Sequence, residues 1–283
     1  MLWWLAPCPL QLFITFAFMK KNQPIGIFDS GIGGLTVAKA ISNLLPNESL
    51  LYFGDTEHMP YGDRSAEHIR QYSENIAEFL IAKGAKILVI ACNSASSVTY
   101  QLLKDKYKGQ IDVVGVISPV VDYVVSKDIK KVGIIGTKAT IGSKNHEVLL
   151  KEKKSSIKVV SLATPLLAPM IEEGFFNNSI SQTIINSYLS NWRLKGIQAL
   201  VLACTHYPLI KKEILKYYNK RVEVIDTTEI IANAVRKSLQ EQKLLHTGKR
   251  GTDHFYVSEF TESFEKTTNV FYGSQVRIEQ IKL

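Results

Sequence analysis

Two cysteines stand at matching places in the two halves of the chain. Cys92 follows the apolar run "ILVIA", and Cys204 follows the similar run "LVLA". Polar clusters come next, "NSAS" after the first cysteine and "THYP" after the second. A thiol can serve as nucleophile, metal ligand or general acid/base, and its reactivity depends on its surroundings. The repeat indicates chemistry that uses both thiols.

The pairing favours some of these reactions over others. Two thiols and His206 leave a zinc site short of its usual fourth ligand. A Cys-His hydrolase needs one nucleophile, so the second thiol would have no role. Two inert buried cysteines are a further alternative, since free cysteine packs as a small hydrophobe. A symmetric pair suits inversion at a carbon acid, where one thiolate removes the α-proton and the opposing thiol supplies another.

Two further side chains could tune the thiols. His206 follows Cys204 by two residues, and Asp29 ends the apolar run "PIGIF". Either could instead be structural, His206 as a packed ring and Asp29 as a helix N-cap. The segment "DSGIGG", residues 29–34, is neither a Walker A loop nor a complete dinucleotide fingerprint. We therefore expect the glycines to allow a close backbone approach rather than to bind a nucleotide.

The elements that must position these residues alternate regularly from Pro24 onward. Short β-branched runs are separated by amphipathic segments such as residues 66–83 and 180–194, which predict helices. The predicted buried strands are "PIGIF", "LLYFG", "KILVIA", "DVVGV", "KVGIIG", "KVVSL", "ALVLA" and "VEVID". This alternation predicts an α/β fold with parallel sheets, whose active residues gather beyond the carboxyl ends of the strands.

Composition and charge exclude several classes of protein. The 283 residues are 46% hydrophobic and 21% charged, as in an ordinary globular protein that can bury a large core. The net charge of +8 comes from scattered Lys and Arg without the dense basic stripe of a nucleic-acid-binding face. We expect no nucleic-acid partner. Three cysteines make no disulfide framework, so we expect a reducing, cytoplasmic location.

The first eighteen residues, "MLWWLAPCPLQLFITFAF", are apolar and uncharged. The run contains two prolines, lacks a basic start and a cleavage site, and is shorter than the ~20 residues of a membrane-spanning helix. We expect translation from Met19 or an extension without function, residues 1–23 lying outside the fold. A membrane anchor is the alternative, and we expect no membrane contact.

Four motifs together resemble the cofactor-independent glutamate racemases of the wider aspartate/glutamate racemase superfamily. They are "FDSGIGG", "GDTEHMPYG", "ACNSAS" and "ACTHYP", and the resemblance extends from Pro24 to about Arg236. It implies two similar Rossmann-like or flavodoxin-like lobes with the active site between them. It also implies a homodimer, no pyridoxal phosphate, no metal, and D-glutamate supplied for peptidoglycan.

The resemblance also implies roles for individual residues. Cys92 and Cys204 would be the catalytic acid/bases, assisted by Asp29, His206 and an acidic residue of "MIEEG", which is Glu172 with Glu173 as the alternative. The glutamate would be held by Asp29, Ser30, Tyr61, Gly62, Asn93, Ser94, Thr205 and His206. The family usually has Thr in place of Ser94, which keeps the hydroxyl.

The chain is expected to cross between lobes twice. Residues 24–116 and 226–283 would form the first lobe, and residues 117–225 the second. Other functions stay open at this point: an aspartate or hydantoin racemase, or a two-lobed binding protein without turnover, which both retained thiols disfavour. Binding to DNA gyrase, known for some family members, has no supporting feature in this sequence.

Overall fold

The computed structural model describes residues 20–260, 268–274 and 276–283. The apolar residues 1–19, with their anchor alternative and most of the predicted extension 1–23, lie outside the described residues. Among the residues that are described, no helix is both long and apolar enough to cross a membrane.

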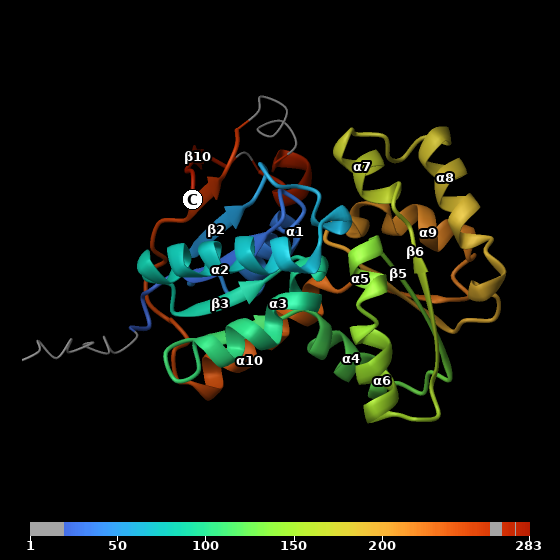
Figure 1. The fold of residues 1–283 in the computed structure, drawn as a ribbon, viewed down its shortest axis with the longest axis horizontal. Helices are drawn as coiled ribbons and strands as arrows, with labels where there is room; N and C mark the ends of the chain where they lie inside the picture. The colour runs from blue at the N-terminus through green and yellow to red at the C-terminus, as the bar shows by residue number, and fades with distance from the viewer. Residues whose placement is uncertain (1–19, 261–267, 275) are drawn as a thin grey trace, which may run out of the picture.

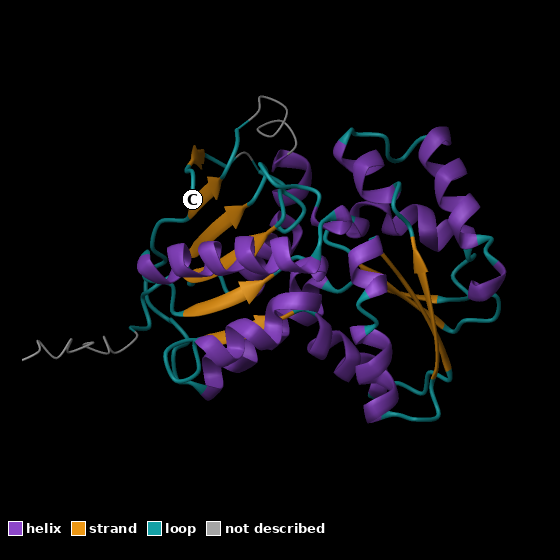
Figure 2. Cartoon of the chain, in the orientation of Figure 1, coloured by secondary structure: helices purple, strands orange, loops and turns teal. Residues whose placement is uncertain are grey.

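The chain forms two parallel sheets side by side, each covered by helices (Figure 1, Figure 2). Sheet A has the order β10 (Ile278–Gln280), β9 (His254–Val257), β2 (Leu50–Gly54), β1 (Ile25–Asp29), β3 (Ile87–Ile90), β4 (Asp112–Gly115). Sheet B has the order β6 (Lys158–Ala163), β5 (Lys131–Gly136), β7 (Ala199–Ala203), β8 (Glu223–Ile225). The predicted α/β fold with two similar lobes is confirmed.

The order of strands in sheet B repeats that of the four strands β2, β1, β3 and β4 of sheet A. β5 corresponds to β1, with β6 and β7 as its neighbours where β1 has β2 and β3, and β8 stands at the place of β4. Consequently β3 and β7, the strands that lead to Cys92 and Cys204, occupy equivalent positions. The two thiols are related by the repeated topology.

Helices cover both faces of sheet A. The helices packed around it are α1 (Leu35–Leu44), α2 (Ala66–Ala82), α3 (Asn93–Lys106) and α10 (Thr228–Glu241). The helices of the second lobe are α4 (Ile117–Val125), α5 (Lys138–Gly142), α6 (Asn145–Lys153), α7 (Leu167–Glu172), α8 (Ser179–Leu189) and α9 (Lys211–Tyr217). Short 3-10 turns are η1 (Tyr61–Asp63), η2 (Trp192–Leu194) and η3 (Tyr207–Ile210).

Two apolar cores follow from this layering. One lies between sheet A and the helices α2 and α3, where Phe28 and Phe53 meet Ile76 and Leu80. The other occupies the opposite face of sheet A, passes between α1, α10 and α4, and continues through sheet B. The second core therefore joins the lobes on the side of the strands away from α2.

All eight strands predicted from the sequence are present, and the predicted helix over residues 180–194 is α8 followed by η2. Two strands at one edge of sheet A, β9 and β10, were not predicted. β10 has three residues, two of them exposed, and so offers almost no alternating pattern. Both edge strands come after α10, and β9 pairs with β2 in parallel. The predicted lobe borders stay a prediction.

A buried ion pair holds four segments of the chain together. The ammonium group of Lys86 lies 2.5 Å from the Glu48 carboxylate, and the two side chains are 0% and 1% exposed. The same ammonium donates to the carbonyls of Lys21 and Leu244, and Glu48 accepts from the backbone N–H of His246. The pair therefore links the start of the fold to the segment after α10.

We predict that Glu48→Gln lowers the free energy of unfolding by about 3 kcal/mol, because it leaves the Lys86 charge buried without its partner. Urea unfolding followed by circular dichroism measures this change. Lys106→Met is the matched control: its ion pairs with Glu74 and Glu78 are exposed, so a loss below about 1 kcal/mol is expected. Equal losses in the two variants would contradict the prediction.

Candidate active site

The two cysteines line one cavity between the sheets, at the carboxyl ends of their strands. Side chains of both lobes surround it: Ser30, Pro60, Tyr61, Gly62, Cys92, Asn93, Ser94, Thr137, Ala168, Glu172, Ala203, Cys204, Thr205 and His206. The cavity volume that the centre of a water molecule can occupy is about 30 Å³. That is far below the roughly 300 Å³ at which ligand pockets usually begin, so the lobes are closed.

Cys92 is the N-cap of α3. Its sulfur accepts a hydrogen bond from the backbone N–H of Ala95 at 3.5 Å and donates to the hydroxyl of Ser30 at 3.6 Å. Burial raises the pKa of this thiol to about 12, and the charges of Asp29 and Cys204 act in the same direction. Cys92 therefore holds its proton in this closed state, although the helix N-terminus favours an anion there.

Cys204 has a different neighbour, the imidazole of His206. Nδ1 of His206 lies 3.7 Å from the Cys204 sulfur, and Nε2 lies 2.8 Å from a carboxylate oxygen of Glu172. Burial by itself lowers the pKa of His206, but Cys204 and Glu172 outweigh it and raise the pKa well above its usual value. The ring is thus an imidazolium between a thiol and a carboxylate.

Asp29 lies behind the cavity at the end of β1 and is fully buried. It accepts hydrogen bonds from the backbone N–H of Gly31 at 3.1 Å and from the hydroxyl of Thr205 at 3.4 Å. Burial raises the pKa of its carboxyl group, although nearby His206 and backbone N–H groups oppose the rise. Asp29 therefore contacts the residue next to Cys204 and adds negative potential at Cys92.

Matching hydrogen bonds join the lobes on the two sides of the cavity. Asp29, after β1, accepts from Thr205 of the second lobe, and Thr137, after the equivalent strand β5, shares a 2.8 Å hydrogen bond with Ser94 of the first. Thr36 of α1 adds a 2.9 Å bond to the carbonyl of Thr205. The repeated topology thus extends to the contacts that close the site.

Glycines permit this close approach. A Cβ at Gly33 would lie 2.4 Å from Cε1 of His206, and a Cβ at Gly62 would lie 2.8 Å from Cβ of Thr137. Distances this short require the neighbouring side chains to shift, which would disturb the contacts between the lobes, so glycine suits both places. Gly33 of the "DSGIGG" segment therefore permits contact between the lobes.

The buried carboxylate of Asp55 fixes the Tyr61 side chain by a hydrogen bond. Its hydroxyl donates to Asp55 at 2.5 Å, and Asp55 also accepts from Ser258 at 2.9 Å and faces Nδ1 of His58 at 2.9 Å. Burial and the adjacent Asp55 both raise the pKa of Tyr61, which stays neutral. The phenol therefore points away from the cavity, and the ring and backbone form its wall.

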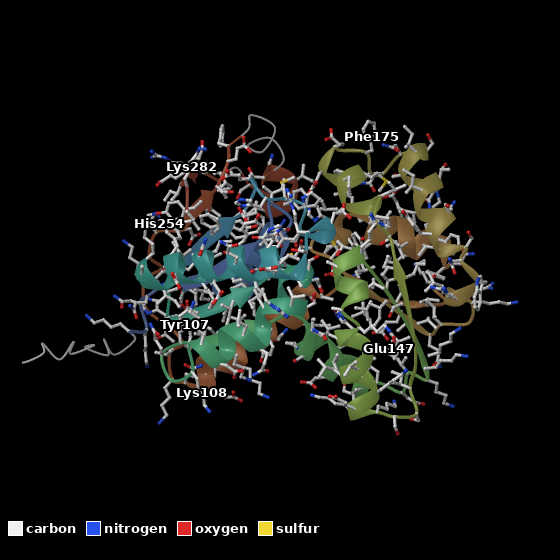
Figure 3. The ribbon with its side chains drawn as sticks, in the orientation of Figure 1. Tyr107, Lys108, Glu147, Phe175, His254 and Lys282 are labelled. Carbon is white, nitrogen blue, oxygen red and sulfur yellow. The ribbon has the colours of Figure 1, made fainter. Side chains whose placement is uncertain are left out.

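The residues predicted from the sequence come together, with one distinction between the two glutamates. Glu172 lines the cavity beside His206, whereas Glu173 is exposed at the end of α7. Phe175, two residues further on, is 47% exposed and lies at the outer edge of this lobe (Figure 3). The geometry favours Glu172 as the acidic neighbour, and the roles of the site residues stay predictions.

Thr137 and Ala168 line the cavity without having been predicted. The signal for Thr137 was present, because "TKAT" follows β5 as the other polar clusters follow their strands. Ala168 in α7 carries no polar group that could have marked it. In the described part of the chain, no group of three or more His, Cys, Asp or Glu is arranged to hold a metal ion.

Comparison with known proteins gives a consistent family. The family described as Asp/Glu/Hydantoin racemase matches residues 32–235. The glutamate racemase of Geobacter metallireducens is 40% identical over 256 residues, covering 90% of this chain and 94% of that protein. The glutamate racemase of Enterococcus faecalis is 37% identical over 270 residues, covering 94% and 98%.

Solved structures agree with the sequence relatives. The crystal structure of glutamate racemase from Francisella tularensis in complex with D-glutamate has a TM-score of 0.87 and 37% identity, covering 93% of this chain and 98% of that one. The aspartate racemase of Picrophilus torridus, at 20% identity and a TM-score of 0.57, shares the fold. The chain therefore belongs to the Asp/Glu/hydantoin racemase family and is an amino-acid racemase.

Proposed function

We propose that this protein interconverts L- and D-glutamate by a two-thiol acid/base mechanism. The observation that carries the proposal is the pair of thiols from topologically equivalent strands, Cys92 after β3 and Cys204 after β7, in one cavity. Inversion needs a base on one side of the α-carbon and an acid on the other, and exchange of their protonation states reverses the reaction.

The unequal surroundings of the thiols give the starting state. Cys92, with its raised pKa, holds a proton, and Cys204 faces the His206 imidazolium. The enantiomer whose α-hydrogen points at Cys204 is deprotonated first, and Cys92 then delivers its proton to the opposite face. After the turnover the protons have changed places, and the site is ready for the other enantiomer.

The carbanion needs stabilisation from fixed polar groups, since the α-proton of an amino acid is weakly acidic. The side-chain Nδ2 of Asn93 is buried in the site and has no hydrogen-bond partner among the described residues. The N-terminus of α3 and the hydroxyls of Ser30, Ser94 and Thr205 surround the same space. These donors suit the carboxylates of the substrate, and the closed lobes exclude water.

Glutamate is the substrate that the relatives favour. Proteins named glutamate racemase match over about nine-tenths of this chain, and the solved relative from Francisella tularensis holds D-glutamate. D-glutamate made here would serve peptidoglycan synthesis in the cytoplasm, and the enzyme would work as a homodimer without metal or pyridoxal phosphate. These further points follow from the family resemblance.

The first prediction concerns the thiols themselves. Purified enzyme with L-glutamate and no added cofactor should lose optical activity, whereas Cys92→Ser and Cys204→Ser each reduce the rate by roughly 10²–10⁴. Circular dichroism follows the reaction, and thermal unfolding checks that both variants fold. Aspartate and a hydantoin are run beside glutamate. If aspartate or the hydantoin turned over faster than glutamate, that compound would be the substrate in place of glutamate. Full activity without one thiol would contradict the two-thiol mechanism.

A second prediction concerns the charge beside Cys92. The ultraviolet absorbance of the Cys92 thiolate, taken as the difference between the enzyme and Cys92→Ser, should rise with pH at a midpoint well above the ordinary thiol pKa of 9.0, because burial and Asp29 both disfavour the thiolate. Asp29→Asn removes the charge with little change in shape, so the midpoint should move to lower pH. A thiolate midpoint at the ordinary pKa in the unmodified enzyme would contradict the assignment of the proton to Cys92.

A third prediction concerns closure. Because the cavity is too small for an amino acid, the cross-lobe bonds of Thr205 and Ser94 must part to admit it. Solution X-ray scattering of Cys204→Ser, whose turnover is expected to be slow, should give different radii of gyration without ligand and with saturating D-glutamate. An unchanged radius, with binding verified by calorimetry, would rule out opening of the lobes.

A further inference from the structure

Phe271 packs against the His206 ring. The two ring centroids are 5.3 Å apart at an interplanar angle of 83°, an edge-to-face contact within the usual range of aromatic pairs. Phe271 is 2% exposed and lies in the helical segment 268–272, which follows β9 in the chain. A residue far from either catalytic motif therefore contacts the imidazole beside Cys204.

The polar contacts of His206 do not by themselves fix its ring. Nδ1 lies 3.7 Å from the Cys204 sulfur, the group whose alignment is in question, and 3.5 Å from the Thr205 hydroxyl, which is long for a hydrogen bond to oxygen. Nε2 is 2.8 Å from Glu172, yet it has no partner with hydrogen-bond geometry among the described residues. Glu172 therefore attracts the His206 ring by its charge but does not fix the orientation of the ring.

Packing against neighbouring residues fixes the orientation of the His206 ring. The Cε1 edge of the ring lies against Gly33, where even a Cβ would come within 2.4 Å. Phe271 meets the ring nearly at right angles, so rotation of the imidazole about its bond to Cβ would drive it into the phenyl group. One contact comes from the segment after β1 and the other from the segment after β9. Both limit the same rotation of the ring.

We propose that Phe271 is a positioning residue that holds the His206 imidazole in line with the Cys204 sulfur. The inference rests on the proposed two-thiol function, in which His206 stabilises the Cys204 thiolate. Misalignment of His206 would slow only the proton transfer at Cys204 and leave that at Cys92 unchanged. A residue that merely stabilises the fold would affect both transfers alike.

The surroundings of Phe271 make its side chain hard to replace. Phe271 also lines a cavity of about 470 Å³ with Thr36, Leu209 and Val270. A smaller side chain would enlarge this space rather than let neighbours close on His206. Phe271→Leu should therefore free the ring, while Phe271→Tyr keeps the aromatic contact and can direct its hydroxyl toward the cavity.

Isotope effects separate positioning from folding. For Phe271→Leu we expect kcat/KM to fall about 10-fold, equally in both directions because the equilibrium constant between enantiomers is one. With α-deuterated substrates, the isotope effect on kcat/KM should rise for the enantiomer deprotonated by Cys204 and fall for the other. A lower fraction of folded enzyme changes neither isotope effect. An equal fall in rate with both isotope effects unchanged would overturn the proposal.

A second readout does not depend on turnover. Spectra of the full chain labelled with ¹⁵N-histidine, with the His206 signals identified by His206→Gln, report the ring directly. Phe271→Leu should shift or broaden those signals, and Phe271→Tyr should restore them and keep kcat/KM within about twofold, since the aromatic contact persists. Unchanged signals in Phe271→Leu would overturn the proposal even if the protein did not racemise glutamate.

Phe79→Leu is the matched control. Phe79 in α2 makes edge-to-face contacts with Phe53 at 5.5 Å and Tyr256 at 5.4 Å on the opposite face of sheet A, without contact to His206. Its loss should lower stability as the loss of Phe271 does, with unchanged isotope effects and His206 signals. Effects on His206 as large as those of Phe271→Leu would show that any lost aromatic ring suffices and would overturn the proposal.

Discussion

The carboxyl edges of two parallel sheets face each other so closely that hydroxyls of one lobe bond to groups of the other. Thr205 reaches the buried carboxylate of Asp29, and Thr137 reaches Ser94. This approach needs Gly33, because any Cβ there would collide with His206. The burial that follows changes the proton affinities of the site. It raises the pKa of Cys92 to about 12, while Cys204 and Glu172 outweigh the effect of burial at His206 and raise the pKa of its imidazole.

The repeated topology places the two thiols opposite each other in the cavity, while their neighbours give them different surroundings. β3 and β7 hold the same place in their sheets, so Cys92 and Cys204 approach one cavity from the two lobes. Cys92 is held by a helix N-terminus and a serine, whereas Cys204 is held by a charged histidine. The proposed reaction needs one thiol protonated and the other ionised, and the unequal surroundings set which of them holds the proton at rest.

Much of this could be predicted from the sequence because the signals were local. Apolar runs ending in polar clusters marked the strands and placed Cys92, Asn93 and Cys204 at their carboxyl ends. The edge strand β10, with two of its three residues exposed, gave no such pattern, and Phe271 looked like any core residue. Its contact with His206 arises from how the chain returns to sheet A after α10, which no short motif records. The choice between Glu172 and Glu173 likewise needed the end of α7 in three dimensions.

The central claim is that two bases act on opposite faces of one carbon. The direct measurement is proton NMR at Cα during the first turnovers of L-glutamate in D₂O, with the enantiomers separated before analysis. Two thiols predict that the D-glutamate formed carries deuterium at Cα, while the remaining L-glutamate keeps its proton. Deuterium appearing equally in the remaining L-glutamate, or D-glutamate that retains the substrate proton, would mean that a single base serves both faces and would contradict the account.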